Sequence, residues 1–516
     1  MADVPSNVTY KQLHERFVSN LNGTSVFEIG KVASAAPIGI FLRSILFNIL
    51  FAKQENLTEH IFVDFFFFCS IVFLLEYCTL VVPSLLAVTI LADHINMLIT
   101  TCLCLSMGML FLQALNTSKL QKQKFRAILF ADMSGRLPFI GSFRAYVVIA
   151  TAICILAVDF VIFPRRFAKA ETYGSGLMDM GVGAFIFSNA IVSQEARSVH
   201  STETLSSFFG VLFRSLRSSL PLLVIGFLRL ISVKGTDYQE HASEYGVHWN
   251  FFFTLFVVRV MSTVLVRFIP GHSWYGVTGI ILAVLYQYLL SMGGLREFTL
   301  NGTQGDGSRQ GLLDANREGL CSCVGYLALY LIAVQFGKFL FCKRNTVGQW
   351  IKAFLILVTI DVTFYALVRI SQQFVSPISR RMANLSFVLW QVGYNVQLIS
   401  EFLLCDILIT TANHLGLLEG AITGGCHVCY PGKVPDENGK TSRTKQKMPC
   451  TCFISAVNRN QLLFFLLSNV LTGMVNFSIK TIFCTPLKGF VIVGIYLMVL
   501  NFLISVLHLR GKTLKL

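Results

Sequence analysis

Residues 95–115 read INMLITTCLCLSMGMLFLQAL, a run without a single Asp, Glu, Lys or Arg. About 20 mainly apolar residues are enough for a helix to cross the hydrocarbon core of a bilayer. Comparable runs recur along the chain and predict about thirteen transmembrane helices, near residues 34–52, 60–92, 95–115, 144–164, 177–194, 219–233, 248–268, 274–292, 319–341, 350–371, 384–412, 461–482 and 488–509. We therefore expect an all-α fold, a polytopic transmembrane helical bundle that forms a single multispanning domain over residues 1–516.

Two of these runs have unusual lengths. The run 60–92 is too long for one straight helix. Pro83 is expected to break or tilt it, because proline lacks a backbone N–H and clashes with the preceding turn. The run 219–233 is short, and we expect it to borrow residues from its upstream flank.

The overall composition excludes several classes of protein. Of the 516 residues, 54% are hydrophobic and only 13% are charged, and the mean hydropathy is +0.65. A soluble globular protein has about 25% charged residues. This chain therefore cannot build the surface of a soluble enzyme, a nucleic-acid binder or a disordered protein. The 42 Lys and Arg against 27 Asp and Glu give a net charge of +15, so its loops are basic.

The basic residues also predict an orientation, because cytosolic loops of membrane proteins carry an excess of Lys and Arg. If the N-terminal segment 1–33 is lumenal, the segments on the cytosolic side are 53–59, 116–143, 195–218, 269–273, 342–349, 413–460 and 510–516. These cytosolic segments hold more Lys and Arg than the loops on the lumenal side. We expect a lumenal N-terminus and a cytosolic C-terminus, with 413–460 as a mobile cytosolic loop. Glu15 and Glu28 lie in the polar first 31 residues, which do not resemble a cleavable signal peptide.

Fourteen cysteines are spread through the chain, and many lie inside the predicted helices, where they pack as small apolar residues. One cluster has a spacing like that of a metal site and consists of Cys426, Cys429, Cys450 and Cys452, with His427 nearby. A structural zinc site matches it loosely. Free or palmitoylated thiols in a reducing loop are the alternative.

A first polar stretch, ILAVDFVIFPRRFAKAETYGSGLMDMGVG, covers residues 155–183. Asp159 lies near the end of an apolar run, where a charge is costly unless it is paired or lines a cavity. Lys169 follows after Pro164 has ended the helix. A carboxylate that takes a proton from a hydroxyl and an ammonium that stabilises an oxyanion together suit acyl transfer. An ion pair that only holds two helices together would explain the same residues.

A second stretch, DYQEHASEYGVHWNFFFT at 237–254, precedes another predicted span. His241, Glu244 and His248 fall on one face at helical spacing. This face can form a polar wall that binds substrate or an acid–base site. Metal binding fits less well, because the H-E-x-x-H order is missing. An amphipathic interfacial segment with an aromatic belt is the simplest alternative.

Arginines accompany two further polar span ends, GLLDANREG (311–319) and SRRMANLSF (379–387). Planar guanidinium groups suit phosphate recognition. Helix capping by Asp and Asn, with arginines that reach lipid headgroups, would explain the same residues. In the orientation derived above, all four stretches fall on the lumenal side, which favours a common active pocket.

Six blocks together resemble the glycosylphosphatidylinositol (GPI) anchor inositol acyltransferase family of the PIG-W type. They are FVSNLNGTS (17–25), the stretch 155–183, YQEHASEYGVHWNFFFT (238–254), LLDANREG (312–319), SRRMANLSF (379–387) and NRNQLLFFLLSN (458–469). The resemblance implies a multispanning enzyme of the endoplasmic reticulum membrane that works on the lumenal side. It implies transfer of a fatty acyl chain, usually palmitoyl from palmitoyl-CoA, to the inositol 2-hydroxyl of glucosaminyl-phosphatidylinositol. The cysteine cluster matches no motif of this family.

The resemblance implies that Asp159 and Lys169 are the catalytic pair. We expect direct transfer without a covalent acyl-enzyme, in which Asp159 is the general base and Lys169 stabilises the oxyanion or holds Asp159. His241 and His248 are alternative bases, because imidazole titrates near neutral pH. Acyl-CoA is a co-substrate, no other cofactor and no metal is expected, and the bilayer but no nucleic acid is a partner. The expected substrate-binding residues are Arg165, Arg166, His241, His248, Asn316, Arg317, Arg380 and Arg381.

Two other classes of function compete with this one. A polytopic lipid transporter or scramblase also places charges inside the membrane. It predicts inverted repeats with paired broken helices, and none is visible in the sequence. A non-catalytic scaffold subunit would not need ionisable residues gathered on one face of the membrane.

Overall fold

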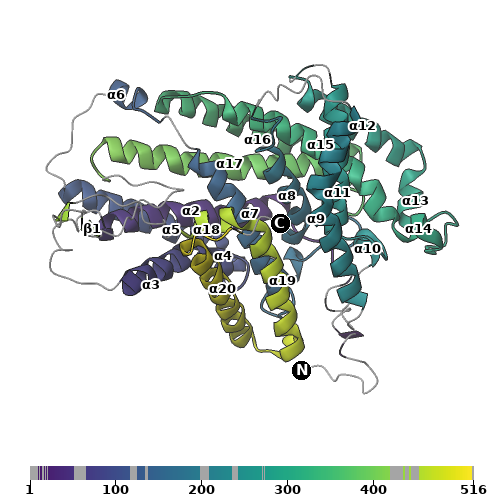
Figure 1. Cartoon of the computed structure of the whole chain (residues 1–516), viewed down its shortest axis with the longest axis horizontal. Helices are drawn as coiled ribbons and strands as arrows, with labels where there is room; N and C mark the ends of the chain where they lie inside the picture. Colours follow the sequence, from purple (N-terminus) through teal and green to yellow (C-terminus); the bar gives the residue numbers. More distant parts are fainter. Residues whose placement is uncertain are drawn as a thin grey trace. The chain divides into compact units, whose positions relative to one another are not determined.

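The computed structural model describes residues 10, 12–13, 17, 19, 21–51, 65–116, 125–133, 137–197, 208–234, 242–269, 271, 273–418, 434–435, 441–442 and 452–513. Most of them form α-helices (Figure 1). They cluster in two compact units, which we call unit 1 (Met1–Ile29, Arg165–Lys343 and Thr359–Val396) and unit 2 (Gly30–Pro164, Arg344–Val358 and Gln397–Leu516). Three helices contribute residues to both units: α2 (Val26–Phe51), α16 (Val347–Phe374) and α17 (Leu385–His414).

Twelve helical segments in the described part of the chain are long and apolar enough to cross a membrane. They are Val26–Leu50, Cys69–Ala87, Ala92–Leu115, Pro138–Ala157, Phe208–Ser232, Phe251–Phe268, Tyr275–Met292, Arg317–Phe341, Val347–Phe374, Leu385–His414, Gln461–Ser478 and Pro486–Leu509. The expected all-α, multi-pass membrane fold is confirmed, with a count close to the thirteen spans predicted.

The run 177–194 accounts for the difference in count. It forms an apolar helical segment over Leu177–Ala190 only, and turns follow it up to residue 197. At 1.5 Å per residue this segment is about 21 Å long, whereas the hydrocarbon core is about 30 Å thick. Ile191 and Val192 continue the apolar run past Ala190 but lie in turns, so hydropathy alone places the end of the helix too late.

Pro83 changes its helix, as expected, without ending it. A π-helical turn, η2 (Tyr77–Val81), joins α3 (Phe65–Glu76) to α4 (Val82–Ala87). Since Pro83 has no N–H, the carbonyl of Thr79 loses its ordinary helical donor. Gly39 lies against this carbonyl so closely that a Cβ atom there would collide with it. Glycine at position 39 therefore allows α2 to approach the π-helical turn η2 closely.

The short run 219–233 is extended upstream, as expected. The helix that contains it, α9, covers Phe208–Lys234. In the segment expected to be a mobile cytosolic loop, residues 413–460, the structure describes the end of α17, two short strands and one further helix, α18 (Phe453–Arg459). Phe453 and Val457 of α18 are buried, so this part of the segment is packed against the protein.

Unit 2 is built around α7 (Pro138–Ala157). This helix packs against α18, α19 (Gln461–Ser478) and α20 (Pro486–Leu509), and α19 and α20 also contact each other (Figure 1). Arg43 and Glu76 form a buried ion pair inside the unit, and Glu76 Oε2 accepts a hydrogen bond from the N–H of Phe453 at 2.8 Å. The remaining elements of unit 2 are η3 (Ala92–His94), α5 (Ile95–Asn116), α6 (Phe125–Leu129), β1 (Val434–Pro435) paired with β2 (Thr441–Ser442), and η6 (Thr481–Phe483).

Unit 1 is built around α15 (Arg317–Phe341), which packs against α8 (Met180–Ala190), α11 (Phe251–Phe268) and α12 (Tyr275–Met292) (Figure 1). Gly279 of α12 lies close to the Ala328 carbonyl of α15, and a Cβ atom at this glycine would be 2.8 Å from that oxygen. Small residues permit such close helix packing in membranes. The other elements of unit 1 are η4 (Arg165–Phe167), η5 (Leu177–Asp179), α9, α10 (Ala242–Tyr245), α13 (Leu295–Asn301) and α14 (Gly311–Ala315).

Candidate functional site

Lys169 lies in the irregular segment of unit 1 between η4 and η5. Its ammonium Nζ donates a hydrogen bond of 2.6 Å to Oε1 of Glu244, which lies on α10. The side chain of Lys169 is 39% exposed and that of Glu244 is 20% exposed. The lysine is therefore held by a carboxylate and still presents part of its side chain outward.

A buried arginine supports this pair. Arg380 lies in the turn between α16 and α17, and its Nη1 is 3.6 Å from the same Glu244 oxygen that binds Lys169. Its Nε donates to Oδ1 of Asp179 at 2.8 Å. Only 6% of Arg380 and none of Asp179 is exposed. Lys169, Glu244, Arg380 and Asp179 thus form a row of alternating charges, which we call the Lys169 cluster.

Asp179 also folds the segment that follows Lys169. Its Oδ2 accepts hydrogen bonds from the backbone N–H of Ala170 at 3.0 Å and of Gly176 at 2.8 Å. A Cβ atom at Gly176 would collide with the carbonyl of Ala168. Glycine is therefore required where the segment returns to Asp179.

The charges of the cluster reinforce one another. Burial raises the pKa of Glu244, but the charges of Lys169 and Arg380 lower it more strongly, and its pKa falls to about 2. Burial lowers the pKa of Arg380, but Glu244 and Asp179 raise it above the usual value. Burial and the neighbouring Glu244 raise the pKa of Tyr245 well above its usual value. Near neutral pH the cluster therefore contains an ionised Glu244 and a charged Arg380.

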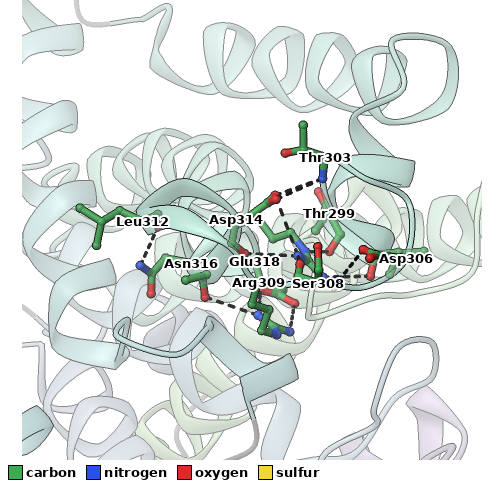
Figure 2. A network of polar contacts seen from close by, with 12 residues as sticks. Thr299, Thr303, Asp306, Ser308, Arg309, Leu312, Asp314, Asn316 and Glu318 are labelled. Carbon is green, nitrogen blue, oxygen red and sulfur yellow. Dashed lines mark hydrogen bonds and ion pairs between the residues drawn. The ribbon is translucent and has the colours of Figure 1, made fainter.

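A second polar network surrounds Glu318 at the start of α15 (Figure 2). Arg309 donates from Nη1 to Oε2 of Glu318 at 3.0 Å and from Nη2 to Oε1 at 2.7 Å. Arg381 donates from Nη2 to Oε1, also at 2.7 Å. Glu318 is completely buried. The adjacent arginines of the sequence SRRM therefore bind different carboxylates, Arg380 in the Lys169 cluster and Arg381 here.

Two expected substrate-binding residues hold the loop before α15. Arg317 is 1% exposed, and its guanidinium donates to the backbone carbonyls of Thr299, Ser308, Asp314 and Leu300. Asn316 donates from Nδ2 to the carbonyl of Leu312, and its Oδ1 accepts from the backbone N–H of His248 at 2.8 Å (Figure 2 shows the bond to Leu312). These contacts favour a role for Arg317 and Asn316 in shaping the loops of unit 1.

The remaining expected arginines lie in η4. The guanidinium carbon of Arg165 is 3.9 Å from the ring centroid of Phe17. Arg166 donates from Nε to Oε1 of Glu28 at 2.9 Å, and both side chains are partly exposed. Of the two histidines in the second stretch, His248 is described and partly buried, whereas His241 lies outside the described residues.

Asp159 belongs to unit 2, and Lys169 belongs to unit 1. Asp159 follows the end of α7, is 4% exposed, and accepts a hydrogen bond at Oδ2 from Nδ2 of Asn476 on α19 at 2.8 Å. A buried carboxylate held by an amide agrees with the cost of placing a charge at a span end. The expected pairing of Asp159 with Lys169 stays a prediction.

The cysteine cluster is mostly outside the described residues, since Cys426, His427, Cys429 and Cys450 belong to the part that is not described. Cys452 is described and buried, and Arg43 Nη2 lies 3.4 Å from its Sγ. Within the described ranges, no group of three or more His, Cys, Asp and Glu side chains is arranged to hold a metal ion.

Similarity to known proteins extends over nearly the whole chain. The GWT1 family model matches residues 10–507. The glucosaminyl-phosphatidylinositol-acyltransferase PIGW of Bos taurus is 38% identical over 522 residues, which cover 98% of this chain and 100% of the relative. PIGW of Homo sapiens is 36% identical over 520 residues, 98% of this chain and 99% of its own. GPI-anchored wall transfer protein 1 of Gibberella zeae is 34% identical over 529 residues, 96% of each chain.

The chain belongs to the GWT1/PIGW family. It is therefore a multi-pass membrane enzyme, an acyltransferase of GPI-anchor biosynthesis, as the six sequence blocks implied. Neither a lipid transporter nor a non-catalytic scaffold subunit is therefore needed to explain the polar stretches of this chain.

Sequence reasoning missed two carboxylates in this member of the GWT1/PIGW family. The sequence places Glu244 in a polar wall with His241 and His248 but does not connect it with Lys169, and it gives no role to Asp179. A signal was present for both, because each is an acidic residue in one of the polar stretches. Only the fold shows that they meet at Arg380, which lies far away in the sequence.

Proposed function

We propose that this acyltransferase moves a fatty acyl chain, palmitoyl, from acyl-CoA to the inositol 2-hydroxyl of glucosaminyl-phosphatidylinositol. One observation supports this more than any other: the end-to-end similarity to PIGW of Bos taurus, whose name states the acceptor lipid and the type of transfer. Acyl-CoA as the donor is part of the proposal, because a thioester provides a good leaving group for direct transfer.

We propose that Asp159 and Lys169 carry the chemistry. Asp159 takes the proton of the inositol hydroxyl while the oxygen of that hydroxyl forms a bond to the thioester carbonyl carbon. Lys169 stabilises the oxyanion of the tetrahedral intermediate or holds Asp159. The carbon–sulfur bond then breaks, and the CoA thiolate leaves and takes up a proton. The products are the inositol ester and CoA–SH, with no covalent bond to the enzyme.

The expected substrate-binding arginines fall into two groups. Arg165 and Arg166 lie in the short helix η4 just before Lys169, so we assign them to the phosphate groups of the lipid or of CoA. Arg380 and Arg381 bind buried carboxylates, and Arg317 binds carbonyls. We assign these three to shaping unit 1 around the substrate.

The imidazole of His248 remains an alternative base, as does that of His241. His248 is partly buried, and its backbone is bonded to Asn316. A histidine base would predict a pH dependence near neutrality. The pH dependence of acyl transfer therefore distinguishes a histidine base from a carboxylate base.

We propose that the enzyme resides in the endoplasmic reticulum membrane with a lumenal N-terminus and a cytosolic C-terminus. An odd number of crossings is needed for this, so Leu177–Ala190 and the turns that follow would have to complete a thirteenth crossing. Glycan attachment at the sequon Asn22-Gly-Thr24, measured together with protease access to a C-terminal tag, tests the orientation. A glycosylated N-terminus with a protease-protected tag would contradict it.

The catalytic assignment is tested by acyl transfer in membranes that contain Asp159→Asn, Lys169→Ala, His241→Ala or His248→Ala. The control is Glu297→Gln, which removes one exposed negative charge in unit 1. We expect the first two variants to lose activity by at least about 10²-fold, the usual scale for a general base or an oxyanion donor. Full activity in Asp159→Asn would remove Asp159 from the mechanism, and loss only in the histidine variants would favour a histidine base.

A further inference from the structure

Glu244 joins the proposed catalytic lysine to the buried interior of unit 1. We propose that Glu244 is a positioning residue for Lys169 and that Arg380 and Asp179 hold Glu244 and the lysine segment in place. The inference rests on the proposed role of Lys169 in acyl transfer. It adds residues that act through the lysine without contacting substrate.

The first support is that one carboxylate oxygen of Glu244 contacts both Lys169 and Arg380. Oε1 of Glu244 accepts the hydrogen bond from Lys169 Nζ at 2.6 Å and lies 3.6 Å from Arg380 Nη1. Arg380 cannot move freely, because its Nε is bonded to the completely buried Asp179. The position of the lysine ammonium is therefore determined by a chain of contacts that ends in the interior.

The second support is that the same aspartate holds the backbone beside the lysine. Asp179 Oδ2 accepts the N–H of Ala170, the residue after Lys169. Both ends of the lysine, its backbone and its ammonium, are thus connected to the Arg380–Asp179 pair. A lysine side chain has a flexible four-carbon stem, and holding it at two ends removes most of its freedom before the substrate arrives.

The third support is the difference in exposure within the Lys169 cluster. Lys169 keeps 39% of its side chain exposed, whereas Arg380 is 6% exposed and Asp179 is not exposed at all. Of the residues in the row, the lysine is the one best able to meet a reacting group. The others can affect the reaction only through their hold on it.

Glu244 itself is unsuited to be the base. The cations that act on it are Lys169, Arg380 and Arg229 of α9, and the phenols near it are Tyr245 and Tyr326. With a pKa of about 2, its carboxylate binds a proton too weakly to remove one from a sugar hydroxyl near neutral pH. Its carboxylate instead accepts the hydrogen bond that positions the ammonium group of Lys169.

The test compares kcat and KM of purified enzyme that carries Glu244→Gln, Glu244→Asp, Lys169→Ala or the double change Lys169→Ala/Glu244→Gln. Glu297→Gln is the matched control, and melting temperatures in detergent report folding. We expect Glu244→Gln to lower kcat about 10²-fold, the scale for misplacing a catalytic group, with little change in the KM for acyl-CoA.

Two further comparisons exclude a purely structural role. Glu244→Asp keeps the carboxylate that binds Lys169, so we expect it to recover part of the kcat that Glu244→Gln loses. The double variant should be no slower than Lys169→Ala, because a residue that acts through the lysine has nothing to act on once it is gone. A kcat of folded Glu244→Gln equal to that of the unaltered enzyme would overturn the inference. So would a double variant whose loss equals the product of the two single losses.

The same measurements separate this inference from the proposed function. If Lys169→Ala remains fully active, the role of Lys169 and the positioning role of Glu244 fail together. If Lys169→Ala is inactive and Glu244→Gln is normal, only the positioning role fails. If Glu244→Gln does not fold, Glu244→Asp decides: a lower kcat with an unchanged KM supports the positioning role, and an unchanged kcat overturns it.

Discussion

Arg380 donates a hydrogen bond of 2.8 Å from Nε to Oδ1 of Asp179, a residue 201 positions earlier in the chain. Both side chains are buried, and Asp179 also binds two backbone N–H groups of the segment that carries Lys169. The pair therefore joins the turn before α17 to the polar stretch that ends in α8. Removal of either charge would leave its partner buried and unpaired.

Asp179→Asn is expected to destabilise the protein strongly. Breaking a buried ion pair by removing one partner costs about 3–5 kcal/mol, and an amide oxygen cannot replace the charge next to Arg380. The melting temperature in detergent should fall clearly, whereas Asp306→Asn, which changes an exposed aspartate, should leave it nearly unchanged. Equal melting temperatures for the two variants would show that the pair contributes little to stability.

Glu318→Gln is expected to loosen the loop between α13 and α14. Glu318 binds Arg309 (Figure 2) and also Arg381. The neutral side chain would therefore leave two guanidinium groups without their carboxylate. Hydrogen exchange of residues 302–310 should become faster, while exchange in α12 should not change. Unaltered exchange in the loop would mean that the bonds of Arg317 to its carbonyls are sufficient to hold it.

Gly325→Ala should disturb the turn that carries Arg380 and Arg381. A Cβ atom at Gly325 would collide with the carbonyl of Ala383, and Ala383 has a left-handed backbone with φ of 46°. Overpacking of this kind costs about 1–3 kcal/mol. The variant should melt at a lower temperature and lose activity. Gly181→Ala is the control, since its added Cβ atom meets nothing within 4 Å; an equal effect of both changes would refute the explanation.

The ion pairs of Glu244 should stabilise the protein over a defined pH range. The folded pKa of about 2 lies below the ordinary value of 4.5, so the unfolded chain takes up the proton first as the pH falls. The stabilisation is complete above about pH 4.5, decreases as the pH falls toward 2, and is absent below that value. The difference in melting temperature between the unaltered protein and Glu244→Gln should therefore be constant from about pH 8 to 5 and shrink at lower pH. A difference that grows with acidification would contradict the assigned sign.

The membrane fold and the family could be predicted from one sequence because their signals are local. The apolar run 95–115 is visible without any partner, and blocks such as 312–319 and 379–387 are contiguous. The connection of Lys169 to Glu244 could not be predicted in the same way, because the two residues are 75 positions apart and many other acidic residues were equally suitable partners. The end of the helix Leu177–Ala190 could not be predicted either, since the apolar residues Ile191 and Val192 follow it in turns.

The most direct test of the account is reconstitution of the purified full chain in lipid vesicles with palmitoyl-CoA and glucosaminyl-phosphatidylinositol. Mass spectrometry would follow the acylated lipid, and a thiol reagent would follow released CoA. We predict one palmitoyl group on the inositol ring for each CoA released, with this product strongly reduced for Asp159→Asn and unchanged for Glu297→Gln. Folded protein that releases no CoA and forms no inositol ester, or that only moves lipid between leaflets, would contradict the account.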